Sequence, residues 1–311
     1  MDHEARGGPL TRRAVLRLMT AAAAAAGPAR AGASPSILQR PIASSGETLP
    51  VVGLGTWRTF DVGGSAAERT PLKEVLQRFV ELGGRVVDSS PMYGTAESVV
   101  GDLASGLGVS EKLFLATKVW TSGRQAGVAQ MEQSLRRLRV RKLDLMQIHN
   151  LLDWRTHLGT LRDWKKEGRI RYLGVTHYTS SAYGELERVL KSESLDFVQV
   201  NYSLGEREAE QRILPLARER GIAVLVNRPF SEGGLFQRVR GQPLPAWAAE
   251  VGCESWAQIF LKWIIAHPAV TCVIPATSRP EHLVDNMKAG SGTFPDAAGR
   301  ERIASAVAAV R

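Results

Sequence analysis

The sequence predicts an α/β protein built as a single (β/α)8 barrel, or TIM barrel, with a short N-terminal hairpin and a C-terminal helix. Eight short apolar segments, typical of buried parallel strands, alternate with eight segments of helical periodicity. Three of the apolar segments end abruptly in a charged or titratable residue. In a barrel of this kind the carboxyl ends of the strands form the catalytic face. The 311 residues suit one such barrel, and we find no second domain.

The predicted elements follow one another regularly along the chain. We expect strands at 51–56, 85–88, 113–118, 143–149, 172–176, 197–201, 223–227 and 271–275. We expect helices at 72–82, 96–105, 128–138, 160–167, 181–190, 208–220, 255–266 and 280–289. A hairpin with its turn at 44–47 precedes the first strand, and a helix at 297–310 follows the last unit. The longest other connection, 228–252, is expected to lie over the catalytic face.

The first 31 residues have the pattern of an export signal. Arg12 and Arg13 precede an apolar run, and residues 29–31 read as an A-x-A cleavage site. The paired arginines resemble a twin-arginine (Tat) signal. The alternative, a transmembrane anchor, would need roughly 20 apolar residues, which this run does not reach. We therefore predict a signal peptide at 1–31, a linker at 32–36 and the barrel at 37–311, with Tat-dependent export to the periplasm or beyond and no stable membrane anchor.

Composition narrows the class of protein further. With 44% hydrophobic and 23% charged residues the chain is of ordinary globular type, and its net charge of +9 is scattered. No basic stripe interleaved with aromatic residues indicates nucleic-acid binding. The chain has two cysteines, Cys253 and Cys272. Cys272 lies in an apolar run and is expected to be a buried thiol, while the pairing of the two is left open.

Four polar residues are placed where predicted strands end. Asp88 ends the second strand and Tyr93 follows it, Lys118 ends the third strand, and His149 ends the fourth. An isolated tyrosine has a pKa near 10, so it is a reluctant proton donor at neutral pH. A nearby ammonium lowers that pKa, and a carboxylate would hold the ammonium charged and oriented. A histidine N–H could steer a carbonyl oxygen towards the phenol.

Together these residues would polarise a carbonyl and protonate the developing alkoxide. They lack a hydride source, so a cofactor is required for reduction. Nothing near Asp88 and His149 repeats a metal-ligand spacing, and no metal is expected. The alternative for each residue taken singly is structural: an ion pair of Asp88 with Lys118, a satisfied core histidine, or a tyrosine that caps a loop.

The chain resembles the aldo-keto reductase family over nearly all of residues 37–290. The resemblance is carried by GLGTW at 53–57, VVDSSPMYGTAE at 86–97, ATKVW at 116–120, LDLMQIHN at 143–150, GRIRYLGVTHY at 168–178, DFVQVNYSL at 196–204 and VIPATSRPEHLVDN at 273–286. It implies reduction of an aldehyde or ketone with NADPH, NADH being possible. It also implies that Tyr93 is the general acid, that Lys118 and Asp88 tune its pKa, and that His149 orients the substrate.

The same resemblance implies contacts with the nicotinamide half of the cofactor. Thr176 and His177 stand where the family more often has Ser-Asn, and Gln199 matches the residue that meets the carboxamide. Asn227 occupies the position of the aromatic residue that stacks on the nicotinamide, which an asparagine cannot do. The adjacent Arg228 and Phe230 could reshape this part of the site.

The phosphate half is expected after the eighth strand, where such barrels commonly bind phosphate. The run 278–281 reads as a capping box, with Pro280 in the first turn of a helix whose free N–H groups suit an anion. Two basic positions of the family are here Ala276 and His282. Further candidate contacts are Thr277, Ser278, Arg279 and Asn286.

Trp57 and Trp120 are expected to form walls of the substrate pocket, although packing would explain them equally well. The short segment after residue 289 predicts an open site that accepts several carbonyl compounds. Two other functions were weighed. One is a nicotinamide-binding sensor or partner protein with little turnover. The other is an isomerase or aldolase that uses Lys118 as a Schiff base. Neither the physiological substrate nor the oligomeric state follows from the sequence.

Overall fold

The computed structural model describes residue 1 and residues 36–310. The chain divides into two compact units, Met1–Ser36 and Ile37–Arg311. The predicted signal peptide and linker therefore lie almost wholly outside the described residues. In residues 36–310 we find no helix of the length and apolar character that a bilayer crossing would need.

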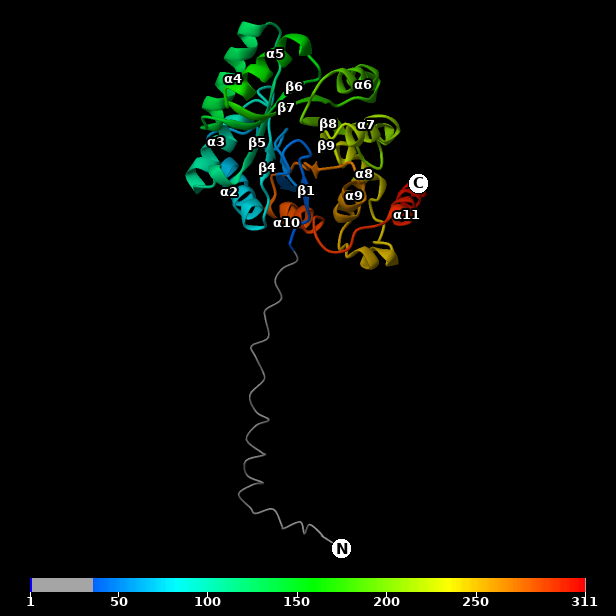
Figure 1. The fold of residues 1–311 in the computed structure, drawn as a ribbon. Helices are drawn as coiled ribbons and strands as arrows, with labels where there is room; N and C mark the ends of the chain where they lie inside the picture. The colour runs from blue at the N-terminus through cyan, green and yellow to red at the C-terminus, as the bar shows by residue number, and fades with distance from the viewer. Residues whose placement is uncertain (2–35, 311) are drawn as a thin grey trace. The chain divides into compact units, whose positions relative to one another are not determined.

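The second unit is a barrel of eight parallel strands, as predicted (Figure 1). The strands are β3 (Leu54–Gly55), β4 (Val86–Asp88), β5 (Phe114–Val119), β6 (Leu143–His149), β7 (Ile170–His177), β8 (Phe197–Asn201), β9 (Ala223–Asn227) and β10 (Cys272–Val273). Each pairs with the next in chain order. Parallel bridges from Val52 to Val273 and from Gly55 to Ala276 connect the two end strands. The sheet is closed, so it exposes no free edge.

Helices surround the barrel on its outer side (Figure 1). They are α2 (Ala66–Glu81), α3 (Ala96–Leu107), α4 (Arg124–Leu138), α5 (Trp154–Lys166), α6 (Tyr183–Ser192), α7 (Ile213–Glu219), α9 (Trp256–Ile265) and α10 (Pro280–Lys288). Each buries one apolar face against the strands. Helix α2 begins at an N-cap residue typical of helix starts. The Ser65 hydroxyl accepts a hydrogen bond from the Glu68 N–H at 3.3 Å.

One predicted helix is divided. The segment expected as a single helix at 208–220 forms a 3-10 turn, Glu208–Gln211, followed by α7. Pro215 has no N–H to donate to the carbonyl of Gln211, which removes one hydrogen bond that would join the two segments. The connection after β9 contains a short helix α8 (Gly234–Arg238) and two 3-10 turns, at Ser231–Gly233 and Ala246–Val251.

The barrel interior and its outer shell form two separate cores. The interior is filled by alternate residues of each strand, among them Val86, Phe114, Leu145, Tyr172, Phe197, Leu225 and Ile274. A hairpin of β1 (Gln39–Pro41) and β2 (Thr48–Pro50) covers the amino-terminal end, since its flanking Ile42 and Leu49 pack into this cluster. Cys272 lies in the interior, and both Cys253 and Cys272 are buried free thiols.

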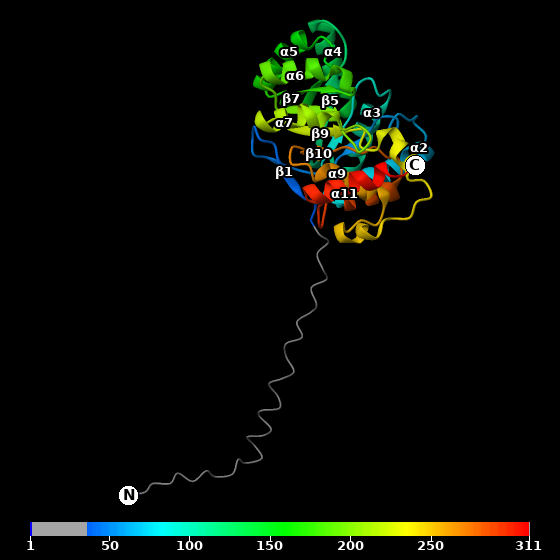
Figure 2. The same ribbon diagram turned by 90° about the vertical axis from the view of Figure 1, so that its right-hand side faces the viewer.

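The predicted terminal helix is α11 (Ala297–Ala308), which lies against α9 (Figure 2). The Trp263 indole N–H donates to the carbonyl of Arg300 at 3.0 Å, and the Arg300 guanidinium donates back to the carbonyl of Trp263 at 3.0 Å. This reciprocal pair fixes the end of the chain to the outside of the barrel, away from the strand ends that carry the site.

Candidate active site

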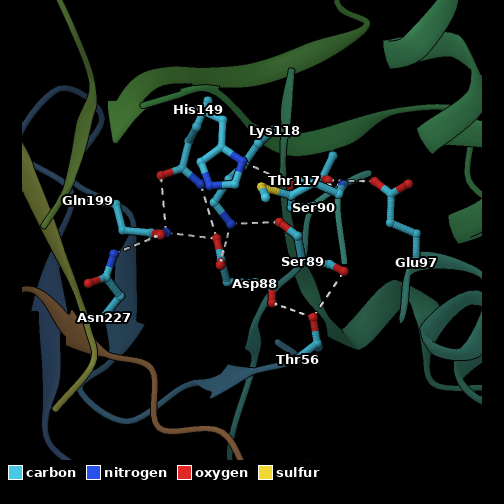
Figure 3. A network of polar contacts seen from close by, with 12 residues as sticks. Thr56, Asp88, Ser89, Ser90, Glu97, Thr117, Lys118, His149, Gln199 and Asn227 are labelled. Atoms are coloured by element: carbon cyan, nitrogen blue, oxygen red, sulfur yellow. Dashed lines mark hydrogen bonds and ion pairs between the residues drawn. The ribbon is translucent and has the colours of Figure 1, made fainter. Parts of the chain in front are cut away.

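The four polar residues singled out in the sequence converge at the carboxyl ends of neighbouring strands. Figure 3 shows three of them, Asp88, Lys118 and His149. The Lys118 ammonium donates to Asp88 Oδ2 at 2.6 Å and to the Ser89 carbonyl at 2.7 Å. It lies 4.9 Å from the centroid of the Tyr93 ring. Tyr93 and His149 meet edge to face, with ring centroids 5.9 Å apart. An acid, an amine, a phenol and an imidazole therefore share one small volume.

Alternation along the strands explains why these side chains point inward. Successive residues of a strand face opposite sides, so residues two apart share a face. Phe114, Ala116 and Lys118 on β5 follow this rule, the first two in the interior core and the third above them. The core thus ends in a layer of polar side chains at the mouth of the barrel.

Hydroxyl groups support the strand ends. The Thr56 hydroxyl donates to the Asp88 carbonyl at 3.0 Å and lies 3.0 Å from the Ser89 hydroxyl. Ser90 Oγ lies 3.1 Å from His149 Nδ1. When Ser90 donates this hydrogen bond, the neutral imidazole carries its proton on Nε2, the other ring nitrogen.

Electrostatics keep the amine charged and the imidazole neutral. Burial lowers the pKa of Lys118, but Asp88 and Tyr93 raise it more, so that the pKa lies above its ordinary value. Burial, helped by Lys118 and His177, lowers the pKa of His149 to about 2. At neutral pH the site therefore contains an ammonium and an uncharged imidazole.

The phenol differs from expectation in one respect. Burial raises the pKa of Tyr93, while Lys118 lowers it and Asp88 raises it, and the net pKa lies above the ordinary value. The expected lowering of the pKa by Lys118 is present but does not dominate, because burial of the phenol raises the pKa by more. Tyr93 is accordingly protonated at neutral pH, the form that a general acid requires.

A cavity of about 570 Å³ opens over these residues. Its charged lining groups are paired, Asp88 with Lys118 and Arg228 with Glu232 at 3.1 Å. Large apolar side chains surround the opening: Trp57, Met92, Trp120, Tyr178 and Phe236, each between 38% and 47% exposed. The predicted pocket walls Trp57 and Trp120 both lie here. The cavity is thus mostly apolar, with a few polar groups at its floor, as ligand pockets usually are.

Some predicted cofactor residues line this cavity and others do not. Thr176, Gln199, Asn227, Arg228 and Phe230 do. His177 lies outside the lining, where its Nδ1 accepts from the Thr179 N–H at 3.2 Å and its ring stacks on Tyr178. The predicted phosphate-site residues also lie outside it: Thr277, Ser278, Arg279, His282 and Asn286.

The expected capping box at 278–281 is wrong. The N-cap of α10 is Arg279, one residue later than Ser278, and no side chain caps the helix. Instead Thr277 Oγ1 accepts from the Arg279 N–H at 3.1 Å, and the carboxylate of Glu281 pairs with the Arg279 guanidinium at 2.8 Å. In the described part of the chain no N-cap side chain bonds the first-turn N–H groups of α10, while the Glu281 carboxylate accepts from its own backbone N–H.

Sequence reasoning missed several residues of the site. Gln147 donates to Asp88 Oδ1 at 3.1 Å, and Ser90 contacts His149. Gln147 is two residues before His149 on β6, so strand alternation could have placed both on the inner face. Tyr178 and Phe236 belong to connections, and no local pattern identifies them as cavity residues.

The fold and site define a barrel protein in which a phenol and a buried ion pair lie at an apolar cleft at the carboxyl ends of the strands. The family model of the Aldo/keto reductase family matches residues 51–301. The chain belongs to this family, and it is an oxidoreductase.

Similar proteins come from several bacteria. The chain is 32% identical to methylglyoxal reductase YeaE of Escherichia coli K12 over 259 residues, 80% of this chain and 88% of that protein. It is 28% identical to aldo-keto reductase YhdN of Bacillus subtilis over 208 residues, 62% of each chain. The structure of an aldo-keto reductase from Klebsiella pneumoniae in complex with NADPH is similar at a TM-score of 0.72 and 26% identity, over 88% of this chain and 96% of that one.

Proposed function

We propose that this protein reduces an aldehyde or ketone to the alcohol with NADPH, and that Tyr93 is the proton donor. The observation that carries the proposal is the buried Lys118–Asp88 pair, 2.6 Å long, directly beside the Tyr93 ring at the floor of an apolar cavity. The relatives support it: one is a methylglyoxal reductase, and two Klebsiella pneumoniae structures are complexes with NADPH and with NADP and acetate.

The residues at the cavity fit such a cofactor. Gln199 and Asn227 both line the cavity, and the Asn227 Oδ1 atom is buried without a hydrogen-bond partner among residues 36–310. Among residues 36–310 no N-cap side chain bonds the first turn of α10, which follows the eighth strand, the usual place for phosphate in a barrel. When bound, NADPH would supply the hydride.

The chain's own residues would handle the oxygen of the substrate. His149, neutral at working pH, would donate an N–H to the carbonyl oxygen and orient it towards the phenol. Tyr93 would transfer its proton to the oxygen as negative charge develops there. Lys118 would stabilise the resulting phenolate, and Asp88 would hold Lys118 in place. The aromatic rim would exclude water from the reacting atoms.

A Schiff-base function for Lys118 is disfavoured by its environment. A nucleophilic amine must be neutral, whereas Asp88 keeps the pKa of Lys118 above its ordinary value. The sensor alternative makes a different prediction, since it requires tight nucleotide binding with negligible turnover.

Two measurements on the purified full chain test the proposal. Titration of NADPH, followed by its fluorescence, should show saturable binding, and a panel of aldehydes and ketones should then be reduced. Binding without turnover would favour the sensor. A lack of saturable NADPH binding would remove both functions.

For the segment that precedes the barrel, we propose Tat-dependent export, supported by Arg12, Arg13 and the apolar run that follows. Folding before export would let the enzyme acquire its nucleotide in the cytoplasm. Cell fractionation of the full chain and of the Arg12→Lys/Arg13→Lys variant tests this. Retention of both chains in the cytoplasm would contradict it.

A further inference from the structure

The connection between β5 and α4, residues 120–123, carries one wall of the cavity. Trp120 is its first residue, lines the cavity and is 41% exposed. The centroid of its indole lies 6.4 Å from the centroid of the His149 ring. The indole therefore borders the place that a carbonyl compound would occupy while His149 orients its oxygen.

Side chains of the two following helices hold this connection in place. From α4, Gln130 Oε1 accepts from the Trp120 N–H at 2.5 Å, and Gln130 Nε2 donates to the Trp120 carbonyl at 3.1 Å. From the start of α5, Asp153 Oδ2 accepts from the Gly123 N–H at 2.7 Å. Trp120 and Gly123 are both exposed, so water competes for these three hydrogen bonds.

The fourth contact is different because a buried histidine makes it. His157 lies on α5 and is fully buried, and its Nε2 atom lies 2.6 Å from the carbonyl oxygen of Thr121. A carbonyl oxygen can only accept, so Nε2 carries a proton and donates. The other ring nitrogen, Nδ1, is buried and has no hydrogen-bond partner among residues 36–310. Within those residues, the polar contact of this ring is therefore the one with the connection after β5.

The imidazole of His157 is confined between α4 and α5. Gly127 of α4 packs against it, and a Cβ atom at that position would lie 2.5 Å from His157 Cε1 and 2.7 Å from Nδ1. Cβ atoms do not approach other heavy atoms so closely, so the ring fits here only because residue 127 is glycine.

The segment between β6 and α5 leads from His149 to these contacts. Three of its residues have left-handed backbone, with φ values of 54°, 55° and 47°: Asn150, Leu151 and Asp153. Residues other than glycine adopt this conformation at a cost in free energy, so surrounding contacts must impose it. The hydrogen bonds of Asp153 and His157 are such contacts. They fasten the segment after β6 to the connection after β5.

We propose that His157 is a positioning residue for the substrate: its hydrogen bond to Thr121 holds the Trp120 indole at the site of reduction. This inference rests on the proposed reductase function. Without the donor, the Thr121 carbonyl would lose its partner and turn towards water. Thr121 adjoins Trp120, so this turn would displace the indole. An aromatic substrate would then lose its contact with the wall, whereas Tyr93 would still protonate a small aldehyde.

The test compares an aromatic with a small aldehyde, benzaldehyde and propanal, in steady-state reduction with NADPH. His157→Leu removes the donor, whereas His157→Gln keeps an N–H at similar reach. Gly127→Ala is an independent approach, since its methyl group would displace the ring from the side of α4. Gly159→Ala is the matched control, because residue 159 is a glycine of α5 with open space around it.

In His157→Leu and in Gly127→Ala, KM for benzaldehyde should rise about threefold to tenfold, as expected for the loss of one hydrogen bond. The kcat for benzaldehyde, and both constants for propanal, should stay within about twofold of the wild-type values. His157→Gln and Gly159→Ala should resemble the wild type. Trp120→Ala should show the same selective loss, and the addition of His157→Leu to it should change nothing more, since both changes act through one wall.

Equal losses for the two aldehydes, no loss, or a further loss in the double variant would overturn the inference and leave the proposed function intact. If His157→Leu does not fold, the comparison of Gly127→Ala with Gly159→Ala decides. Turnover of propanal alone by the wild-type chain would also overturn the inference. Reduction of neither aldehyde by the wild-type chain would overturn the proposed function, and the inference with it.

Discussion

The two ends of the barrel hold similar chemical groups in different arrangements. At the amino-terminal end the hairpin residue Glu47 pairs with Arg171 and with Arg85, and the Tyr172 hydroxyl donates to Glu47 Oε2 at 2.8 Å. At the mouth Asp88 pairs with Lys118, beside Tyr93. Each end therefore has a carboxylate, a cation and a phenol within a few ångströms.

The partner of the phenol separates the two arrangements. The Tyr172 hydroxyl donates its proton in a hydrogen bond to the Glu47 carboxylate and lies 2.7 Å from Ser45 Oγ. Its hydrogen-bonding capacity is therefore used within the protein. At the mouth the carboxylate accepts from Lys118 and from two amides, and the phenol faces the ammonium and the cavity. The first arrangement fastens a hairpin to the barrel. The second leaves a proton available to a ligand.

Removal of each phenol should separate these roles most clearly. We expect Tyr93→Phe to lower kcat for carbonyl reduction by about 10²- to 10⁴-fold, the usual contribution of a positioned general acid, with little loss of stability. Tyr172→Phe should keep kcat within about twofold and cost about 1 kcal/mol of unfolding free energy, since it removes a hydrogen bond to a carboxylate. Steady-state kinetics and urea denaturation measure the two effects. Full turnover by Tyr93→Phe would contradict the assignment.

The next largest difference is expected in stability, when the cation at each end of the barrel is removed. Lys118→Met leaves Asp88 buried without its counter-ion, and we expect a loss of about 3–5 kcal/mol of unfolding free energy. Arg171→Met should lower the unfolding free energy by no more than about 1 kcal/mol. The Arg171 side chain is 34% exposed, so solvent screens its ion pairs.

The double variant Lys118→Met/Asp88→Asn is the control for this comparison. It should recover much of the lost stability without recovering activity, because it removes the unpaired charge and the pKa-tuning pair but keeps an acceptor for Gln147 and Gln199. Equal costs for Lys118→Met and Arg171→Met would show that the mouth is as well solvated as the hairpin end.

Acidification should destabilise the two ends in different pH ranges. The pKa of His149 is about 2 when folded and about 6.5 when unfolded, so below pH 6.5 the unfolded chain binds the extra proton. His149 should therefore cost about 2–3 kcal/mol of stability between pH 6.5 and 4.5. The hydrogen bonds of Glu47 lower its pKa against the effect of burial, so its contribution is present above its unfolded pKa and is lost only as the pH falls below it.

Melting temperatures of wild type, His149→Gln and Glu47→Gln across this range provide the measurement. His149→Gln should flatten the decline between pH 6.5 and 4.5, whereas Glu47→Gln should leave that decline unchanged. A steep decline in His149→Gln would mean that other groups, such as His267, whose pKa burial lowers to about 4, dominate it.

Much of this site could be read in the sequence because it follows from strand alternation. Asp88, Lys118 and His149 end apolar runs, and parallel strands bring their carboxyl ends to one rim. The same alternation also predicts that Gln147, two residues before His149 on β6, faces the interior of the barrel. Residue type alone does not separate the two tyrosines, because either phenol could serve as a proton donor. Tyr172 is excluded by its position, near the beginning of β7 and therefore at the amino-terminal end of the barrel.

Other features were not predictable from local patterns. Whether the N-cap of α10 is Ser278 or Arg279 depends on where Thr277 can reach. The place of His177, by contrast, follows from alternation, because it comes directly after the cavity residue Thr176 on β7. Pro215 favours the division of the helix at 208–220 but does not determine it, since α2 runs unbroken through Pro71.

The sequence by itself determined the eightfold alternation, the order of the reactive residues and the family, because periodicity and spacing are properties of neighbouring residues. Only the tertiary structure decided the hydrogen-bond chain that runs from Asp88 through Gln199 to Asn227. This chain of contacts joins β4, β8 and β9, and it exists only once closure of the barrel has brought these strands together.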